Sequence, residues 1–207
     1  VVCTMGTAGI WKLIMLAWSY ENNLAIPATS TNARFTGGLS RLLKTGYVDR
    51  IVKLDFNSLY PSIDLTWWVK TTLDIDNIML RLLEYILTNR EKYKDLKAEA
   101  GAKADEIKEK LKDFNGTKEE KEKLKEEMAT WKAEKSANDK KQLPLKILAN
   151  SFFGSYGCPL VFPFGDLSAA EKTTCIGRMS LRLMISHFST LSEKFNINDK
   201  RYNYTPI

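Results

Sequence analysis

Residues 53 to 63 hold the clearest candidate for chemistry in the chain: an apolar stretch that ends in one aspartate, Asp55, and breaks into a Ser-Leu-Tyr-Pro turn. A carboxylate at such a position is a hard oxygen ligand for a divalent metal ion. The backbone amides of Ser58 and Leu59, freed by the turn, can bind phosphate oxygens beside it. Pro61 suits the first turn of a helix that begins there. The alternative is structural, since a lone aspartate at the end of a strand is often a helix or turn cap.

The middle of the chain is predicted to form a long antiparallel pair of helices. In residues 77 to 142 lysine and glutamate interleave densely, and apolar residues recur at steps of three and four. These apolar residues are Leu96, Ala100, Ala104, Ile107, Leu111 and Phe114, followed beyond the turn by Leu124, Met128 and Trp131. The turn is predicted at 113 to 117, where Gly116 suits a left-handed C-cap and Thr117 with Glu120 matches a capping box.

Other elements are expected on both sides of this helical pair. Ile10 to Trp18 is predicted to be a buried helix, and it is too short for a membrane span. Val48 to Phe56 has the β-branched and apolar content of a mostly buried strand. A helix is predicted over 167 to 195, and 201 to 207 is typical of a strand that is just beginning. We therefore expect a mixed α/β (α+β) fold.

Composition limits the function only loosely. A chain of 207 residues with 44% hydrophobic residues can build a substantial core, and its net charge of +6 permits a polyanionic partner. The three cysteines include no C-x-x-C pair, so neither a disulfide framework nor a zinc site is predicted, and a reducing, intracellular location is expected. The long charged helices alone would be typical of a coiled-coil interaction protein, which is one alternative function.

Two segments that flank the helical pair resemble motifs of family B DNA polymerases. Residues 55 to 63, D-F-N-S-L-Y-P-S-I, are similar to motif A (D-x-x-S-L-Y-P-S-I), and residues 146 to 154, K-I-L-A-N-S-F-F-G, to motif B (K-x-x-x-N-S-x-Y-G). Residues 35 to 38, F-T-G-G, resemble the Y-x-G-G element, and residues 90 to 94, R-E-K-Y-K, resemble R-x-x-x-K. The segments follow the order of the family, and the resemblance covers nearly the whole chain.

This resemblance implies a palm and fingers fragment of a family B (polymerase alpha-like) enzyme, expected to be of viral or phage type. Residues 1–76 are then the first part of a palm with an antiparallel sheet and motif A. Residues 77–153 are a helical-hairpin fingers subdomain that ends in motif B, and residues 154–207 continue the palm. The enzyme would catalyse template-directed DNA synthesis by a two-metal mechanism, with primer-template DNA and dNTP as partners and no membrane. Its location is expected to be cytoplasmic if the source is a phage or bacterium.

The resemblance also implies roles for individual residues. Asp55 and Lys146 are the expected catalytic residues, and the Asp55 carboxylate and the Phe56 carbonyl are the expected metal ligands. Two Mg²⁺ ions are expected in the full-length enzyme. The expected nucleotide-binding residues are Ser58, Leu59, Tyr60, Arg90, Lys94, Lys146 and Asn150. Tyr60 is the implied sugar gate, meaning a side chain under the incoming sugar that leaves no room for a 2′-hydroxyl. The expected DNA-binding residues are Phe35, Gly37, Gly38, Phe153 and Gly154.

The chain also departs from the family pattern. Phe35 and Phe153 stand where the family motifs have tyrosine, so each keeps an aromatic face but lacks a hydroxyl. No D-T-D pair follows motif B, so the second catalytic aspartate is absent from the sequence. We therefore expect the fragment to bind nucleotide or DNA but to be inactive alone, with motif C, thumb and exonuclease supplied in the same or a second chain. The alternative is a noncatalytic DNA-binding or assembly subunit of a split polymerase.

Overall fold

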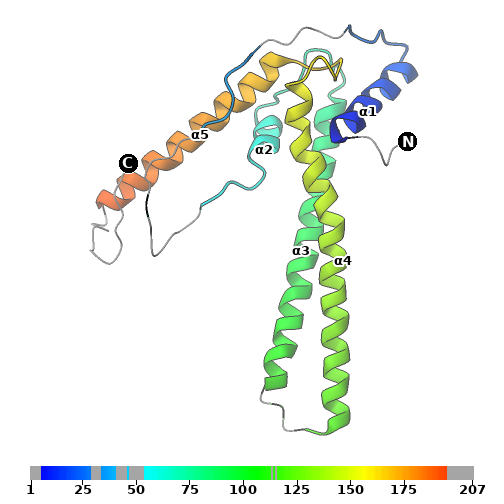
Figure 1. Cartoon of the computed structure of the whole chain (residues 1–207), viewed down its shortest axis with the longest axis vertical. Helices are drawn as coiled ribbons and strands as arrows, with labels where there is room; N and C mark the ends of the chain where they lie inside the picture. Colours follow the sequence, from blue (N-terminus) through cyan, green and yellow to red (C-terminus); the bar gives the residue numbers. More distant parts are fainter. Residues whose placement is uncertain are drawn as a thin grey trace. The chain divides into compact units, whose positions relative to one another are not determined.

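The computed structural model describes residues 6–28, 34–40, 46, 54–112, 114 and 116–194 (Figure 1). Within these residues the chain forms the helices α1 (Thr7–Glu21), α2 (Leu59–Thr66), α3 (Ile78–Lys112), α4 (Lys118–Tyr156) and α5 (Leu167–Lys194). Packing divides the chain into two compact units: the first comprises Val1–Leu80 and Phe152–Ile207, and the second comprises Arg81–Ser151. The division into segments 1–76, 77–153 and 154–207 is a functional one and stays a prediction.

The predicted mixed α/β fold with an antiparallel sheet is wrong for the part of the chain that the structure describes, where all regular elements are helices. A strand persists only where a neighbouring segment exchanges backbone hydrogen bonds with it. Residues 54 to 56, the end of the predicted strand, have no such partner among the described residues. The rest of that segment, 48 to 53, and the predicted strand at 201 to 207 lie outside the described residues.

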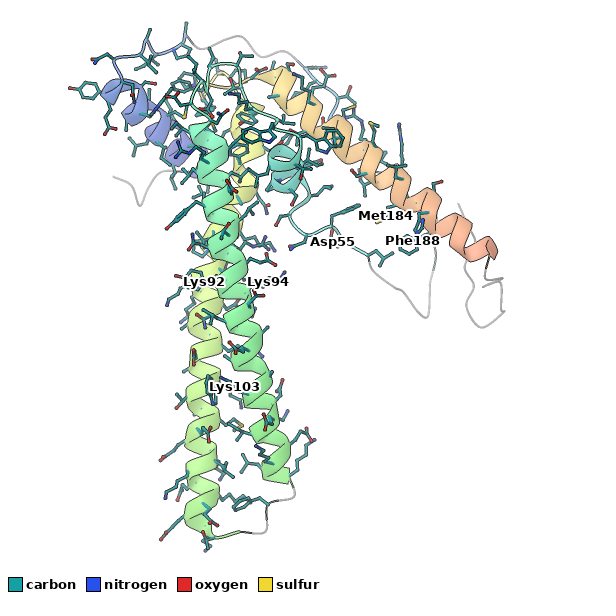
Figure 2. All side chains as sticks on the ribbon, turned by 180° about the vertical axis from the view of Figure 1, so that it is seen from behind. Asp55, Lys92, Lys94, Lys103, Met184 and Phe188 are labelled. Atoms are coloured by element: carbon teal, nitrogen blue, oxygen red, sulfur yellow. The ribbon has the colours of Figure 1, made fainter. Side chains whose placement is uncertain are left out.

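The second unit consists of the long arms of α3 and α4, which run side by side in opposite directions (Figure 1). Lys97 Nζ lies 2.7 Å from Asp139 Oδ1, and Nζ of Lys103, which is labelled in Figure 2, lies 4.2 Å from the Trp131 ring centroid. The residue numbers of these two contacts average 118 and 117, respectively. A nearly constant average is expected when two antiparallel helices are joined by a turn close to that position. The two long helices predicted in the middle of the chain are therefore present, and Ala100, Ala104 and Ile107 of the predicted apolar stripe are buried.

The turn between these helices confirms one local prediction and corrects another. Glu120 Oε2 accepts hydrogen bonds from the Thr117 amide (2.9 Å) and hydroxyl (2.9 Å), and the Glu120 amide donates to Thr117 Oγ1 (3.4 Å), so the capping box is present. The left-handed conformation predicted for Gly116 is absent, because Gly46 is the one described glycine with positive φ. A Cβ at position 116 would instead lie 2.5 Å from Phe114 Cζ, so a side chain there would require the Phe114 ring to move aside.

The core of the first unit is built around α1 and the last turns of α4. Trp11 is fully buried and packs edge-on against Phe152, with 5.1 Å between the ring centroids. Phe152 in turn packs edge-on against Tyr156, with 4.8 Å between the ring centroids. Met15, one turn after Trp11, is also fully buried, so the predicted helix over residues 10 to 18 is confirmed, with one buried face. No described helix is long and apolar enough to cross a membrane.

Candidate functional site

Asp55 lies on the exposed segment that leads into α2 (Figure 2). Phe56 is 37% exposed, and no described residue forms an ion pair or hydrogen bond with the Asp55 carboxylate. The described residues contain no group of three or more His, Cys, Asp or Glu side chains that could hold a metal ion. Because Mg²⁺ is commonly bound through one or two carboxylates, with substrate phosphates and water completing its shell, one accessible carboxylate and a carbonyl fit one side of such a site.

The start of α2 has an unusual backbone. Its N-cap, Ser58, has φ 52° and ψ 49°, the left-handed region that residues other than glycine rarely adopt. The Ser62 amide donates to the Ser58 carbonyl at 2.9 Å, which closes the first turn, and Pro61 lies within that turn as predicted. The first amides of a helix have no acceptor within the helix. The amide of Leu59, the first helical residue, is therefore free of the helix ladder, as the predicted phosphate-binding role requires.

Three motif segments meet at the ring of Tyr60. The ring centroid of Tyr60 on α2 lies 4.8 Å from that of Phe153 on α4, at an interplanar angle of 44°. Phe35 packs edge-on against the same Phe153, with 6.3 Å between the ring centroids. A Cβ on Gly38 would overlap the Tyr60 hydroxyl oxygen, so the backbone of residue 38 lies directly against that hydroxyl. Residues predicted separately from three motifs are thus brought together in the first unit.

Helix α5 holds one of these segments in place. Arg178 Nη1 donates hydrogen bonds to the carbonyl oxygens of Thr36 (2.8 Å) and Gly37 (2.6 Å). Thr174 Oγ1 donates to the same Thr36 carbonyl at 2.8 Å. Sequence reasoning missed both α5 residues. One signal was present, since a glycine inside a helical pattern, here Gly177, is a poorer helix former than alanine and marks that turn of the helix as unusual.

A second link joins α2 to α5 in the interior. Thr173 Oγ1 donates a hydrogen bond to Asp64 Oδ1 at 2.5 Å, and both residues are fully buried. Burial raises the pKa of Asp64 to about 7, because the charged form loses its hydration, while the Thr173 bond opposes the rise. The pKa of Tyr156 is raised as well, first by burial and then by the charges of Asp64 and Asp74. Sequence reasoning missed this group, although Asp64 interrupts an apolar run.

In the second unit the predicted cationic residues lie on two facing helices. The Arg90 side chain is buried, with 9% of its surface exposed. Lys94, one turn further along α3, is exposed, and its Nζ lies 3.3 Å from Glu91 Oε1. The antiparallel register defined above places Arg90 level with residues 144 to 146 of α4, which include Lys146. Lys146 and Asn150 are one turn apart and both exposed. The roles of these residues stay predictions.

Two predicted DNA-binding residues have little around them. Gly154 lies on α4 and is exposed, and a Cβ there would meet no atom within 4 Å. Gly37 is also exposed and has the same open space. Both positions are accessible, and their predicted contact with DNA stays a prediction.

Comparison with known proteins agrees with these motifs. The model of the family described as DNA polymerase family B matches residues 1–205. The chain belongs to DNA polymerase family B.

Individual relatives come from archaea. The chain is 34% identical over 213 residues to a DNA polymerase of Thermococcus sp. (strain 9oN-7), an alignment that covers 94% of this chain and 24% of the relative. It is 30% identical over 202 residues to DNA polymerase 1 of Pyrococcus abyssi, which covers 88% of this chain and 24% of the relative. The chain thus spans about a quarter of the length of these relatives. They give no support to the predicted viral or phage type, and no solved structure matches the chain significantly.

Proposed function

We propose that this chain is the nucleotide-binding part of a DNA polymerase that extends a primer on a DNA template. The reaction would transfer a nucleotidyl group from a dNTP to the primer 3′-hydroxyl. The observation that carries the proposal is the convergence at Tyr60, whose ring contacts Phe153 and whose hydroxyl lies against Gly38. A substrate site assembled from separate motifs requires these segments to meet, and they belong to a chain of the matching family.

The metal-binding role falls to Asp55 and Phe56. Their carboxylate and carbonyl oxygens would hold a divalent ion, and the exposure of the segment leaves room for substrate oxygens. When bound, two Mg²⁺ ions would supply Lewis-acid stabilisation of the attacking and leaving oxygens. The second carboxylate ligand is proposed to come from motif C of the polymerase, in the same or a second chain. We therefore expect the 207 residues alone to bind nucleotide without extending a primer.

The remaining residues would bind and orient the triphosphate. The amides at the start of α2, from Ser58 and Leu59, are proposed to donate to the β- and γ-phosphates. Arg90, Lys94 and Lys146 would neutralise phosphate charge. Positioning and charge neutralisation supply most of the catalysis in phosphoryl transfer, so these cations matter even without covalent chemistry.

The base and sugar of the nucleotide would meet a different set of residues. Tyr60 is proposed to lie under the sugar and to exclude a 2′-hydroxyl, and Asn150 to line the pocket of the new base pair. The DNA strands are proposed to pass the aromatic faces and open glycines of the first unit, namely Phe35, Gly37, Gly38, Phe153 and Gly154. Phenylalanine at positions 35 and 153 allows stacking but no hydrogen bond to a base.

Primer extension by the full-length polymerase tests the metal-binding role. Asp55→Asn is expected to lower the rate of incorporation by roughly a thousandfold, the order found when a principal electrostatic group is removed. Asp95→Asn, which changes an exposed aspartate on α3, is the matched control and is expected to keep the wild-type rate. Equal rates for Asp55→Asn and the wild type would exclude the proposed metal ligand.

Nucleotide binding by the 207-residue chain tests the cationic residues. Lys146→Ala is expected to weaken binding of dATP with Mg²⁺ about tenfold, because a charge-assisted hydrogen bond is lost. Lys132→Ala removes another exposed lysine of α4 and is expected to leave affinity unchanged. Isothermal titration measures both, and a loss of affinity shared equally by the two variants would indicate a general charge effect instead of a site.

A further inference from the structure

We propose that Gly177 on α5 is a positioning residue for the sugar gate: together with Gly38 it fixes the ring of Tyr60 and so sets the selectivity of the polymerase for deoxyribonucleotides. We call this arrangement the two-glycine contact (Gly38 and Gly177). The inference rests on the proposed function, because it concerns how that site chooses its substrate.

At Gly177 a side chain would crowd the Tyr60 ring, which would have to shift by a few tenths of an ångström. A Cβ there would lie 3.0 Å from Tyr60 Cε1, 3.6 Å from Tyr60 Cδ1 and 3.7 Å from Ile63 Cδ1. The first distance is tighter than ordinary van der Waals contact. Gly177 is buried in the interior of α5, where glycine is a poor helix former compared with alanine. The local cost of glycine is therefore consistent with a need for space at the tyrosine.

The ring is bounded on two further sides. Gly38 lies against its hydroxyl, where any Cβ would overlap the oxygen. The Phe153 ring packs against the Tyr60 ring in a tilted arrangement, with ring centroids 4.8 Å apart and an interplanar angle of 44°. Because these contacts come from the segment before α2, from α4 and from α5, the Tyr60 ring has little freedom to shift within the first unit.

The same turn of α5 also holds the other glycine in place. Arg178, next to Gly177, donates to the carbonyl oxygens of Thr36 and Gly37, and Thr174 donates to that of Thr36. The position of Gly38 is thus tied to α5 through its neighbours in sequence. Both glycines are consequently positioned by α5: Gly177 is part of this helix, and Gly38 follows the residues that the helix binds.

This arrangement matters for sugar selectivity because exclusion of a 2′-hydroxyl is steric. A displaced ring is expected to leave space that the hydroxyl can fill. A methyl group at position 177 is expected to push the ring away from α5 while leaving the triphosphate-binding groups unchanged. Misplacement by about 1 Å can change rates by as much as a hundredfold.

The test compares incorporation of a deoxyribonucleotide and the matching ribonucleotide by the full-length polymerase. Gly177→Ala is expected to lower the selectivity ratio about tenfold, mainly through faster use of the ribonucleotide. Gly6→Ala is the control, because a Cβ at this residue ahead of α1 meets no atom within 4 Å. A merely structural role for Gly177 would lower both incorporations equally, and an unchanged ratio contradicts the proposal.

A second variant covers the case in which Gly177→Ala folds poorly. In the Tyr60→Ala background the ring is gone, so adding Gly177→Ala is expected to change neither folding nor selectivity further. If the double variant folds less well than Tyr60→Ala alone, the methyl group clashes with atoms other than the Tyr60 ring, and the two-glycine contact is overturned.

A readout without activity separates this inference from the proposed function. In the 207-residue chain labelled with 3-fluorotyrosine, Gly177→Ala is expected to shift the ¹⁹F signal of residue 60, whereas Gly6→Ala leaves it in place. An unmoved signal contradicts the contact itself. If the signal shifts but the wild-type polymerase shows no incorporation, or Tyr60→Ala keeps full selectivity, the proposed function or the gate has failed and the packing relationship stands.

Discussion

The hydroxyl of Thr173 on α5 donates a hydrogen bond to the buried carboxyl group of Asp64 on α2. Asp64 lies one turn after Tyr60 on the same helix, and Thr173 lies one turn before Gly177. This bond therefore ties the helix of the proposed sugar gate to the helix of its positioning glycine. The other carboxyl oxygen, Oδ2, has no hydrogen-bond partner among the described residues.

Stability is expected to depend on pH through Asp64. Its folded pKa, about 7, exceeds the ordinary value of 3.8, so the folded state binds the proton more tightly than the unfolded state. The contribution to the free energy of unfolding is then fully present below the ordinary pKa and falls as pH rises toward 7, by about 4 kcal/mol at most. Asp64→Asn is expected to remove this fall, which urea unfolding at pH 5 and pH 8 measures.

The control for this experiment is Asp55→Asn, which changes an exposed carboxylate in the same unit. This substitution leaves the buried Asp64 carboxyl group in place, so the fall in stability that is due to Asp64 is expected to remain. If Asp64→Asn shows the same difference between pH 5 and pH 8 as the wild type, the buried carboxyl group does not titrate in this range.

Two glycines of the first unit are expected to respond oppositely to alanine. A Cβ at Gly165 would lie 2.7 Å from Pro159 Cα and 2.9 Å from the Phe162 carbonyl oxygen, which are backbone atoms that cannot move aside cheaply. Gly165→Ala should therefore destabilise the fold by about 1–3 kcal/mol. Gly154→Ala, in open space on α4, should stabilise it by about 0.5–1 kcal/mol through helix propensity. Denaturant midpoints distinguish the two, and a shift of the same sign would contradict this account.

The capping box at the tip of the helical pair is expected to protect the start of α4. Thr117→Ala removes the side-chain acceptor for the Glu120 amide and the hydroxyl that donates to Glu120, at a cost of about 1 kcal/mol. Amide hydrogen exchange over residues 118 to 121 is expected to accelerate about fivefold. Thr130→Ala serves as the control, since Thr130 donates its hydrogen bond to the Glu126 carbonyl within its own helix and takes no part in the cap. Equal amide exchange rates over residues 118 to 121 in the Thr117→Ala and Thr130→Ala variants would argue against a role of the cap.

The attachment of α1 is expected to depend on Trp11. This side chain is fully buried against Phe152, so Trp11→Ala should lower the free energy of unfolding by about 3–5 kcal/mol. Trp67, which is 65% exposed, provides the matched control, and Trp67→Ala is expected to change stability little. Urea unfolding followed by far-UV circular dichroism measures both, and a small effect at Trp11 would mean that α1 is not part of the cooperative core.

Local features were predictable from the residues alone. Steps of three and four between apolar residues indicated α3 and α4, and the Thr117 to Glu120 spacing indicated the cap, because both depend on contacts within one or two turns. The helix predicted over 167 to 195 is present as α5, and the Asp166 carboxylate caps its start by accepting hydrogen bonds from the Ser168 and Ala169 amides. The strand predicted at 48 to 56 is not observed at its described end, residues 54 to 56, which pair with no other strand among the described residues. Strand pairing depends on a second segment and so cannot be predicted from local sequence.

The sequence by itself determined the family, through motif segments that keep their identity and order along the chain. Only the tertiary structure decided that Phe153 and Gly38 contact the same tyrosine, that Gly177 leaves space for its ring, and that Arg178 holds the neighbouring carbonyls. Hydrogen bonds to backbone carbonyls and the absence of a side chain leave no spacing pattern in a sequence. They arise when segments remote along the chain pack together, so the contacts at Tyr60 emerge only in the folded first unit.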